Sequence, residues 1–327
     1  MNKKSGLAGM FCANSIKYAC LRTLFKTVGK MSDGIKVGLK YGFDSGESLD
    51  YVYENRAGGL GPVGKFLDRL YLDSPGWSGI RTRGEIMRQS IRWAIEKSSD
   101  SNETIELIDI ASGPGRYVLD VLIAMKSEGA ASSNSSSMNA QPALKARLYD
   151  MDETGLAFGR ARAAANCVDN VEYVKKNAFL PDSHLVAHTD DKFAQLVDKK
   201  GERCDIAIAS GLYELFPDND LIRASLKNLS STVREGGYLI YTNQPWHPQL
   251  EFISNVLSNR DGEPWVMRCR SQEEIDGLVR DAGFEKISMQ SDDNGIFTVS
   301  IAMRRSLAAS ICNESASRER GQTRSAA

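Results

Sequence analysis

The sequence has few histidines, no CxxC pair and no long apolar run. Its three histidines are His184, His188 and His247, and its six cysteines are scattered along 327 residues. His184 and His188 have the i, i+4 spacing of a helical metal site, but the glutamate of an HExxH motif is missing beside them. The sequence therefore predicts no metal site, and its cysteines indicate the reduced thiols of a cytoplasmic protein.

Charge and hydropathy argue against two further classes of protein. No run of about 18 apolar residues occurs, so a membrane-spanning helix is not expected. The formal net charge of −1 disfavours nucleic-acid binding through bulk positive charge, and no nucleic-acid partner is expected. Residues 1–30 differ, because they hold six basic side chains, no acid and interspersed apolar residues. Such a stretch is typical either of peripheral contact with the inner surface of a membrane or of a partly ordered extension.

The most informative stretch covers residues 105–125. An apolar, β-branched run ends at Asp109, a turn with Gly113 and Gly115 follows, and the next residues are apolar at helical spacing. This pattern predicts a strand, a tight turn and a helix. Glycine in such a turn lets the backbone approach a ligand near the helix N-terminus. The turn is not of the phosphate-binding type, since no Gly-Lys-Ser/Thr follows, and it lacks the third glycine of the dinucleotide fingerprint.

Strands and helices alternate along the rest of the chain. Further strands are expected at 143–149, 171–174, 204–209 and after the glycine turn at 234–237, and an antiparallel pair at 284–290 and 295–303. Together they predict a mostly parallel, seven-stranded sheet with an antiparallel C-terminal hairpin. The expected segments are a basic N-terminal extension (1–50), a helical lid or cap (51–100), an α/β domain (101–303) with a flexible insertion (127–142), and a disordered tail (304–327).

Polar side chains follow the second and third predicted strands. Asp150 ends the second strand, where its carboxylate could accept hydrogen bonds from both ribose hydroxyls of a nucleoside held over the glycine turn. Asp152 is either the N-cap of the next helix or a second contact. Asn177 follows the third strand, where its amide could reach an adenine edge, with Ala178 and Phe179 as apolar neighbours.

Residues 72–83 are rich in turn-forming residues, so we expect a loop there and a helix from 84 to 97. Trp77 in this loop either covers a bound ligand or plugs the end of the sheet. Arg81 and Arg83 either bind a carboxylate or phosphate of a substrate or stay solvated.

The chain resembles class I S-adenosylmethionine-dependent methyltransferases. The residues that carry the resemblance are Asp109-Ile-Ala-Ser-Gly-Pro-Gly-Arg116, Tyr149-Asp-Met-Asp152 and Arg234-Glu-Gly-Gly237. More narrowly, the stretches 71–81, 210–217 and 243–248 resemble a family of methyltransferases often fused to or paired with an α/β-hydrolase. The likeness covers residues 50–303 and implies a Rossmann-like class I fold behind an N-terminal helical extension. No Gly-x-Ser-x-Gly elbow of a hydrolase occurs in the chain.

The resemblance also implies S-adenosyl-L-methionine as the cofactor. The contacts that it implies are Asp109, Ala111, Gly113, Gly115, Arg116, Asp150, Met151, Asn177, Ala178 and Ser210. Ala111 departs from the family pattern, because glycine usually stands at this position. We expect the turn to accept the additional methyl group through a small adjustment.

Methyl transfer from a sulfonium is an in-line displacement, so the protein mainly aligns the nucleophile with the methyl group and removes a proton where one must leave. His247 and Glu214 are the candidate bases, with Tyr213 beside them. The alternative for His247 is a packed loop residue. The residues expected to contact the substrate are Trp77, Arg81, Asn243 and Trp246.

The predicted function is methyl transfer to an O or N nucleophile of a small-molecule or lipid-like acceptor. A methyltransferase acting on RNA or protein is disfavoured by the near-neutral charge and by Ser210-Gly-Leu-Tyr213, which stands where an Asn-Pro-Pro-Tyr motif would follow the fourth strand. A catalytically silent, cofactor-binding partner of a separate hydrolase is the other alternative, and Ala111 is the feature that supports it.

Overall fold

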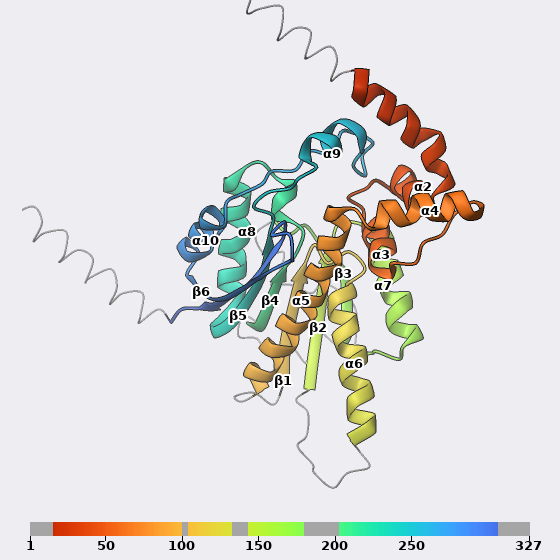
Figure 1. Ribbon diagram of the computed structural model, residues 1–327. Helices are drawn as coiled ribbons and strands as arrows, with labels where there is room; N and C mark the ends of the chain where they lie inside the picture. Colours follow the sequence, from red (N-terminus) through yellow and green to blue (C-terminus); the bar gives the residue numbers. More distant parts are fainter. Residues whose placement is uncertain (1–15, 100–103, 133–142, 180–202, 307–327) are drawn as a thin grey trace, which may run out of the picture. The chain divides into compact units, whose positions relative to one another are not determined.

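The computed structural model describes residues 16–99, 104–132, 143–179 and 203–306 (Figure 1). By its internal contacts the chain forms two compact units. The first unit comprises the residues up to 85 with 244–269 and 291–297, and the second comprises 86–243, 270–290 and the residues from 298 onward.

This division is discontinuous along the chain, whereas the sequence predicts contiguous segments. The reason lies inside the first unit, where residues after 243 pack on N-terminal helices. The rings of Phe25 and Phe252 are 5.5 Å apart between centroids, and the Phe43 amide donates to the Ser258 carbonyl at 2.9 Å. The loop residues that follow the fifth strand are therefore part of the N-terminal unit.

The second unit contains a seven-stranded sheet with the order β3-β2-β1-β4-β5-β7-β6 (Figure 1). Its strands are β1 (Thr104–Ile110), β2 (Ala143–Asp150), β3 (Val171–Lys175), β4 (Cys204–Ala209), β5 (Val233–Asn243), β6 (Phe284–Ser291) and β7 (Thr298–Arg304). The pairs among β1 to β5 are parallel, and β7 runs antiparallel to β5. The predicted fold class, a mostly parallel sheet with antiparallel C-terminal strands, is confirmed.

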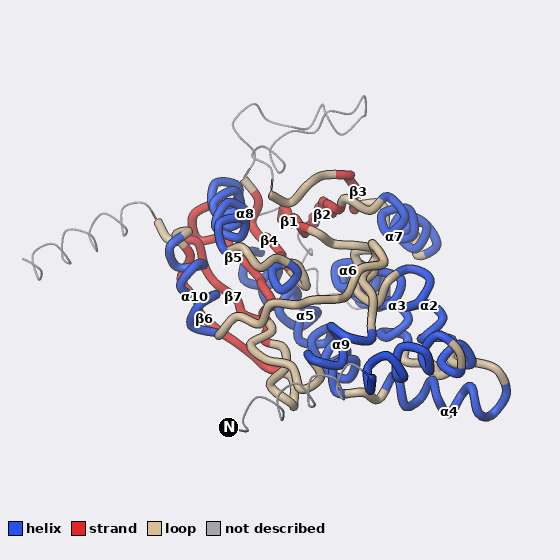
Figure 2. Tube along the Cα trace, turned by 90° about the horizontal axis from the view of Figure 1, so that it is seen from above, coloured by secondary structure: helices blue, strands red, loops and turns tan. Residues whose placement is uncertain are grey.

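Helices cover both faces of this sheet (Figure 2). They are α5 (Pro75–Ser99) from residue 86 onward, α6 (Arg116–Ser132), α7 (Glu153–Ala165), α8 (Asn219–Thr232) and α10 (Gln272–Asp281). One core cluster joins α5, α6 and α7 to one face, and a second joins α8 and α10 to the other. Strand β1 contributes side chains to both core clusters. Ile105 and Leu107 belong to the first cluster, and Ile108 and Ile110 belong to the second.

The expected loop at residues 72–83 is wrong, because α5 already begins at Pro75. Proline is well suited to the first helical position, where its missing N–H has no partner to lose and its φ is preset. The Ser74 carbonyl accepts the first helical hydrogen bond, from the Ser78 amide at 3.0 Å. Gly76 and Gly79, which contribute to the turn-like pattern, make room for neighbours instead, since a Cβ on them would approach His247 at 2.6 Å and Phe297 at 2.9 Å.

Two further boundaries differ from the prediction. Helix α6 continues to Ser132, beyond the expected start of the insertion at residue 127. Strand β5 begins at Val233, ahead of the glycines, and Gly236 with φ 76° accompanies a register irregularity opposite Cys204. His184 and His188 lie outside the described residues.

The first unit is helical. Besides the start of α5 it holds a helix over residues 16–26, η1 (Val28–Met31), α2 (Asp33–Tyr41), α3 (Gly46–Glu54), α4 (Gly61–Leu72) and α9 (Leu250–Val256). Ser32 and Ser45 cap α2 and α3, because their hydroxyl oxygens accept hydrogen bonds from backbone amides of the first turn. Phe43, Leu72 and Trp77 belong to its apolar core.

Candidate functional site

The carboxyl ends of β1 to β4 meet at one edge of the sheet in the second unit. Ile110 of β1 lies beside Tyr149 of β2 and Ala209 of β4, and Asp150 lies beside Lys175 of β3. Ligands of open α/β sheets bind at this edge. The register therefore brings together the predicted cofactor residues, which follow these strand ends: Asp109, Ala111, Gly113, Gly115, Arg116, Asp150, Met151, Asn177, Ala178 and Ser210.

The turn between β1 and α6 has the conformation that its glycines permit. Gly113 and Gly115 have φ values of 54° and 70°, in the left-handed region. A Cβ on Gly115 would lie 2.3 Å from the Leu148 side chain, so this glycine is required by packing as well. No atom of the described residues lies within 4 Å of the position that a Cβ on Gly113 would take, so they leave space beside this glycine.

Ala111 adopts the same left-handed conformation, with φ 55°. The turn thus keeps a conformation suited to glycine and carries a methyl group in it, at a cost of about 1 kcal/mol. The sequence identifies Ala111 as a departure from the family pattern, but the strain at this residue is visible only in its backbone conformation.

Replacing Ala111 with glycine is expected to raise the free energy of unfolding by about 1 kcal/mol, because glycine adopts this conformation without steric cost. Urea denaturation followed by circular dichroism measures the change. Ala161→Gly is the control, since Ala161 is exposed within α7 and glycine there should lower the free energy by about 1 kcal/mol. A loss of equal size in both variants would contradict the strained conformation at Ala111.

Asp150 holds the glycine turn from the neighbouring strand. Its Oδ2 accepts a hydrogen bond from the Gly113 amide at 2.7 Å, and its Oδ1 accepts one from the Asp152 amide at 2.9 Å. Asp152 is the N-cap of α7, because its side chain accepts a hydrogen bond from the Thr154 amide at 2.9 Å. The two carboxylates therefore have different roles, and only that of Asp150 reaches the turn.

Asp109 is a buried acidic residue near the end of β1. Its side chain is 2% exposed, and its Oδ1 has no hydrogen-bond partner in the described part of the chain. Burial raises the pKa of Asp109 well above the ordinary carboxyl value, and the nearby charge of Asp150 raises it further. An arrangement of this kind is typical of a binding site whose ligand completes the polar contacts.

The ends of β3 and β4 add polar and apolar groups to the same edge. The Asn177 Oδ1 accepts a hydrogen bond from the Phe179 amide at 2.9 Å, and Ala178 is buried beside it. Met151 is 55% exposed after β2. The buried Ser210 Oγ has no hydrogen-bond partner within the described residues.

Tyr213 and Glu214 form a short 3₁₀ turn, η3 (Tyr213–Leu215), after β4. Tyr213 is 2% exposed and its hydroxyl contacts the Ser225 Oγ of α8 at 3.2 Å, so its phenol belongs to the core. Glu214 is also buried. Asn243 at the end of β5 is buried and donates to the Arg270 carbonyl at 3.0 Å.

Arg270 was not identified from the sequence. It is 1% exposed, and its guanidinium donates to the carbonyls of Tyr213 and Phe216 at 2.6 Å each. It thereby fixes the loop after β4. Nothing in the local sequence distinguishes this arginine from a surface residue, because its acceptors lie more than 50 positions away.

His247 lies in the first unit as a buried loop residue. Its Nδ1 accepts a hydrogen bond from the Gln249 amide at 3.0 Å, so the ring proton of the neutral form is on Nε2. Burial lowers the pKa of His247 to about 4, although the charge of Asp292 opposes this shift. In this arrangement the imidazole is neutral at pH 7 and its acceptor nitrogen is occupied.

The other first-unit residues predicted to contact a substrate differ in exposure. Trp77 is 6% exposed and stacks on Trp265 with 6.0 Å between centroids, which is a core position. Arg81 donates to the Leu72 carbonyl at 2.8 Å and so joins the end of α4 to α5. Trp246 is 48% exposed and is available to a ligand.

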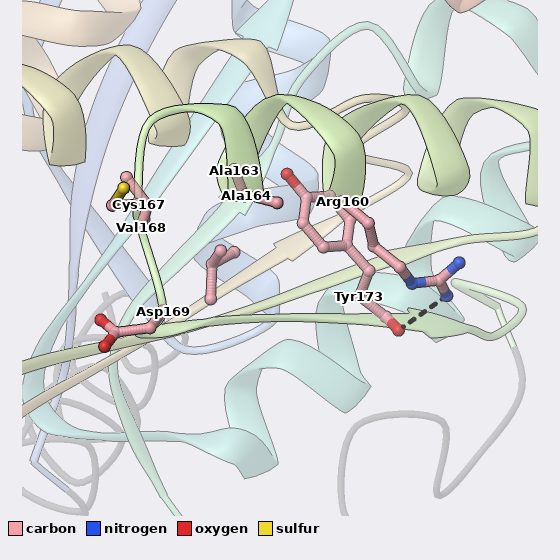
Figure 3. A pocket seen from close by; sticks show the side chains of 8 residues that line it. Arg160, Ala163, Ala164, Cys167, Val168, Asp169 and Tyr173 are labelled. Atoms are coloured by element: carbon pink, nitrogen blue, oxygen red, sulfur yellow. Dashed lines mark hydrogen bonds between the residues drawn. The ribbon is translucent and has the colours of Figure 1, made fainter.

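A separate hollow of about 410 Å³ lies between the end of α7 and β3 (Figure 3). It is lined by Arg160, Ala163, Ala164, Cys167, Val168, Asp169, Val171 and Tyr173. Arg160 donates to the Tyr173 carbonyl at 3.1 Å across it. None of the predicted site residues lines this hollow.

The described residues contain no group of three histidine, cysteine or acidic side chains that could hold a metal ion. Every helix in the described part of the chain is too short or too polar to cross a membrane.

Comparison with known proteins identifies the family and agrees with the fold. A family model described as "Putative methyltransferase" matches residues 4–304. The uncharacterized protein YnbC of Escherichia coli K12 is 42% identical over 292 residues, which cover 89% of this chain and 45% of YnbC. The chain thus spans less than half the length of this curated relative.

Two solved structures share the fold at low sequence identity. One is a possible exported protein from Bordetella parapertussis, with 15% identity, 79% of each chain covered and a TM-score of 0.54. The other is the magnesium protoporphyrin IX methyltransferase ChlM from Synechocystis with bound SAH, with 12% identity, 81% of this chain and 97% of that chain covered, and a TM-score of 0.50. The chain therefore belongs to this methyltransferase family, and it has the class I S-adenosylmethionine-dependent methyltransferase fold.

Proposed function

We propose that this protein binds S-adenosylmethionine at the carboxyl edge of β1 to β4 and methylates an O or N nucleophile of a small-molecule or lipid-like acceptor. The observation that carries the proposal is the hydrogen bond between Asp150 and the amide of Gly113, a glycine beside which the described residues leave space. This hydrogen bond places a carboxylate suited to ribose hydroxyls beside a backbone that a ligand can approach closely.

The residues at this edge fit the chemistry of the cofactor. Two buried oxygens, the Asp109 Oδ1 and the Ser210 Oγ, have no hydrogen-bond partner among the described residues, and such atoms are normally satisfied. An ammonium and a carboxylate on one ligand supply partners of this type. Exposed Met151 and buried Ala178 offer apolar surface for a base, and Asn177 offers an amide.

The cofactor, when bound, supplies an electrophilic methyl group on a sulfonium. The residues of the chain hold and orient it, with Asp150 toward the ribose, Asn177 and Ala178 toward the base, and Asp109 with residues 111–116 toward the methionine end. Glu214 follows β4 at the same edge and is the residue we propose to receive a proton from a hydroxyl acceptor. His247 would do so only after giving up its hydrogen bond from the Gln249 amide.

On the acceptor side we propose contacts with Trp246, which is exposed, and with Arg81. Asn243 and Tyr213 are buried within the second unit, and Trp77 is buried within the first. We further propose that the protein is cytoplasmic and that residues 1–30 contact a membrane. We also propose that it has a hydrolase as a partner. The match covers only 45% of YnbC, so most of that relative lies outside the matched region. This additional length supports the proposal of a partner domain.

Calorimetric titration with S-adenosylmethionine and S-adenosylhomocysteine tests cofactor binding. We expect micromolar affinity in the wild type and at least about tenfold weaker binding in Asp150→Asn, because the amide keeps one acceptor for the turn but cannot accept from two hydroxyls. Asp152→Asn is the matched control in the same loop and should retain the affinity. Binding of neither ligand to the folded wild type would contradict the proposal.

Label transfer distinguishes the alternatives that the sequence left open. Transfer of a labelled methyl group to lipid or small-molecule extracts is expected, whereas binding without transfer to any acceptor would favour the silent partner of a hydrolase. Transfer to RNA that weakens steeply with salt would favour the nucleic-acid alternative.

A further inference from the structure

Helix α4 presents several large apolar side chains to solvent. Its buried positions include Gly64 and Asp68, and Asp68 is 0% exposed. We call the exposed residues Leu60, Val63, Phe66 and Leu70 the α4 apolar stripe; they are 56–68% exposed. Their spacing of three to four residues puts them on one side of the helix. An exposed stripe of this size requires an explanation, because isolated exposed leucines are common but aligned ones are not.

The orientation of α4 is fixed by its buried side. The Asp68 Oδ1 accepts hydrogen bonds from the Ser32 hydroxyl at 2.6 Å and from the Gly34 amide at 2.7 Å. A Cβ on Gly64 would lie 2.4 Å from the Met31 carbonyl oxygen, so the backbones are in close contact there. The helix therefore cannot turn its stripe inward without breaking these contacts (Figure 2 shows α4 beside α2 and α3).

The helix over residues 16–26 has a second stripe of the same kind. Ile16 and Leu24 are 60% and 49% exposed eight residues apart, and Cys20 midway between them is also exposed. The opposite side of this segment packs inward through Tyr18 and Phe25. The charged side chains of this helix are all basic, namely Lys17, Arg22 and Lys26.

We propose that the α4 apolar stripe docks on the surface of a lipid bilayer that contains anionic lipids. The charges favour this occupant, because the two basic side chains of α4, Lys65 and Arg69, reach solvent, while its acid Asp68 is buried. Apolar side chains flanked by basic ones insert at the headgroup boundary of anionic membranes. The helix over 16–26, which has the same combination, adds a second contact within the first unit.

The size of the stripe argues against a second copy of the chain. Four side chains exposed to this degree present on the order of 400 Å² of apolar surface, about half of the ~800 Å² per partner of a stable protein interface. A bilayer needs no complementary shape. Docking there would also bring the enzyme to lipid-like acceptors, but the inference concerns binding and does not depend on methyl transfer.

Vesicle flotation with the full chain tests the inference. We expect binding to vesicles of phosphatidylcholine with phosphatidylglycerol, weaker binding to phosphatidylcholine alone, and release by salt. The double variant Phe66→Gln, Leu70→Gln should lose roughly tenfold or more of the partitioning. Phe158→Gln in α7 is the matched control, since Phe158 is 57% exposed in the second unit and should leave binding unchanged.

Further measurements separate this inference from the proposals above. Circular dichroism shows whether the double variant is folded, and titration with S-adenosylhomocysteine shows whether its cofactor site is intact. The variant Arg22→Gln, Lys26→Gln tests the contact proposed for residues 1–30 on its own. Absence of vesicle binding by the wild type, or binding that the double variant retains, would overturn the docking of α4. A wild-type dimer that becomes monomeric in the double variant, with no change in vesicle binding, would assign the stripe to a second copy instead.

Discussion

Replacing Asp68 with asparagine is expected to lower the free energy of unfolding of the first unit by about 3–5 kcal/mol. The buried carboxylate accepts four hydrogen bonds, from Ser32 and Gly34 on Oδ1 and from Tyr51 and Gly58 on Oδ2. An asparagine keeps one acceptor oxygen and turns an NH₂ group toward two other donors. Each buried donor that loses its acceptor carries the full cost of its desolvation.

Tryptophan fluorescence during urea denaturation measures this effect, because Trp77, Trp246 and Trp265 lie in the first unit. Asp73→Asn is the control. Asp73 follows α4, its side chain is 53% exposed and it pairs with Arg69 at 3.2 Å, so its replacement should change the free energy by less than about 0.5 kcal/mol. Equal effects of the two substitutions would show that Asp68 does not organise the unit.

The parts of the fold that the sequence predicted well depend on local patterns. The alternation of apolar residues in β1 and the glycines that follow identify a strand, a turn and a helix without any long-range contact. The end of β2 at Asp150 is equally clear. That the Asp150 carboxylate accepts from the Gly113 amide could not be predicted, because this bond depends on the register between β1 and β2.

The residues that the sequence did not reveal are buried charges with distant partners. Asp68 and Arg270 have the types of side chain normally found on the surface, and their burial depends on partners at least ten positions away. The start of α5 was missed for a different reason. Proline and glycine at 75 and 76 have the composition of a turn, but proline also suits the first position of a helix, and Gly76 packs tightly on His247.

The substitution Asp109→Asn is expected to stabilise the ligand-free protein at neutral pH and to weaken cofactor binding. Burial, and then the charge of Asp150, raises the pKa of Asp109 in the folded chain. Below the ordinary carboxyl pKa of about 3.9 the group is protonated in both states and contributes no pH dependence. Above it the unfolded chain releases the proton while the folded chain retains it, so the free energy of unfolding of the wild type falls as the pH rises toward the raised pKa.

Asparagine has the same shape and no proton to lose, so its advantage should grow as the pH rises above the ordinary carboxyl pKa of about 3.9. Urea denaturation at several pH values between 4 and 8 measures this difference, and Asp152→Asn, at the exposed cap of α7, should show no such growth. The Asp109→Asn variant should bind S-adenosylmethionine more weakly, because aspartic acid can release its proton and pair with the ammonium group of the ligand, whereas asparagine cannot become a carboxylate. If the Asp109→Asn protein is less stable than the wild type at pH 7, the carboxyl group has a partner in the folded chain. The case for a ligand at that position would then lose its main support. A gain in stability together with a loss of affinity is the combination expected of a group that is kept for binding at the expense of the fold.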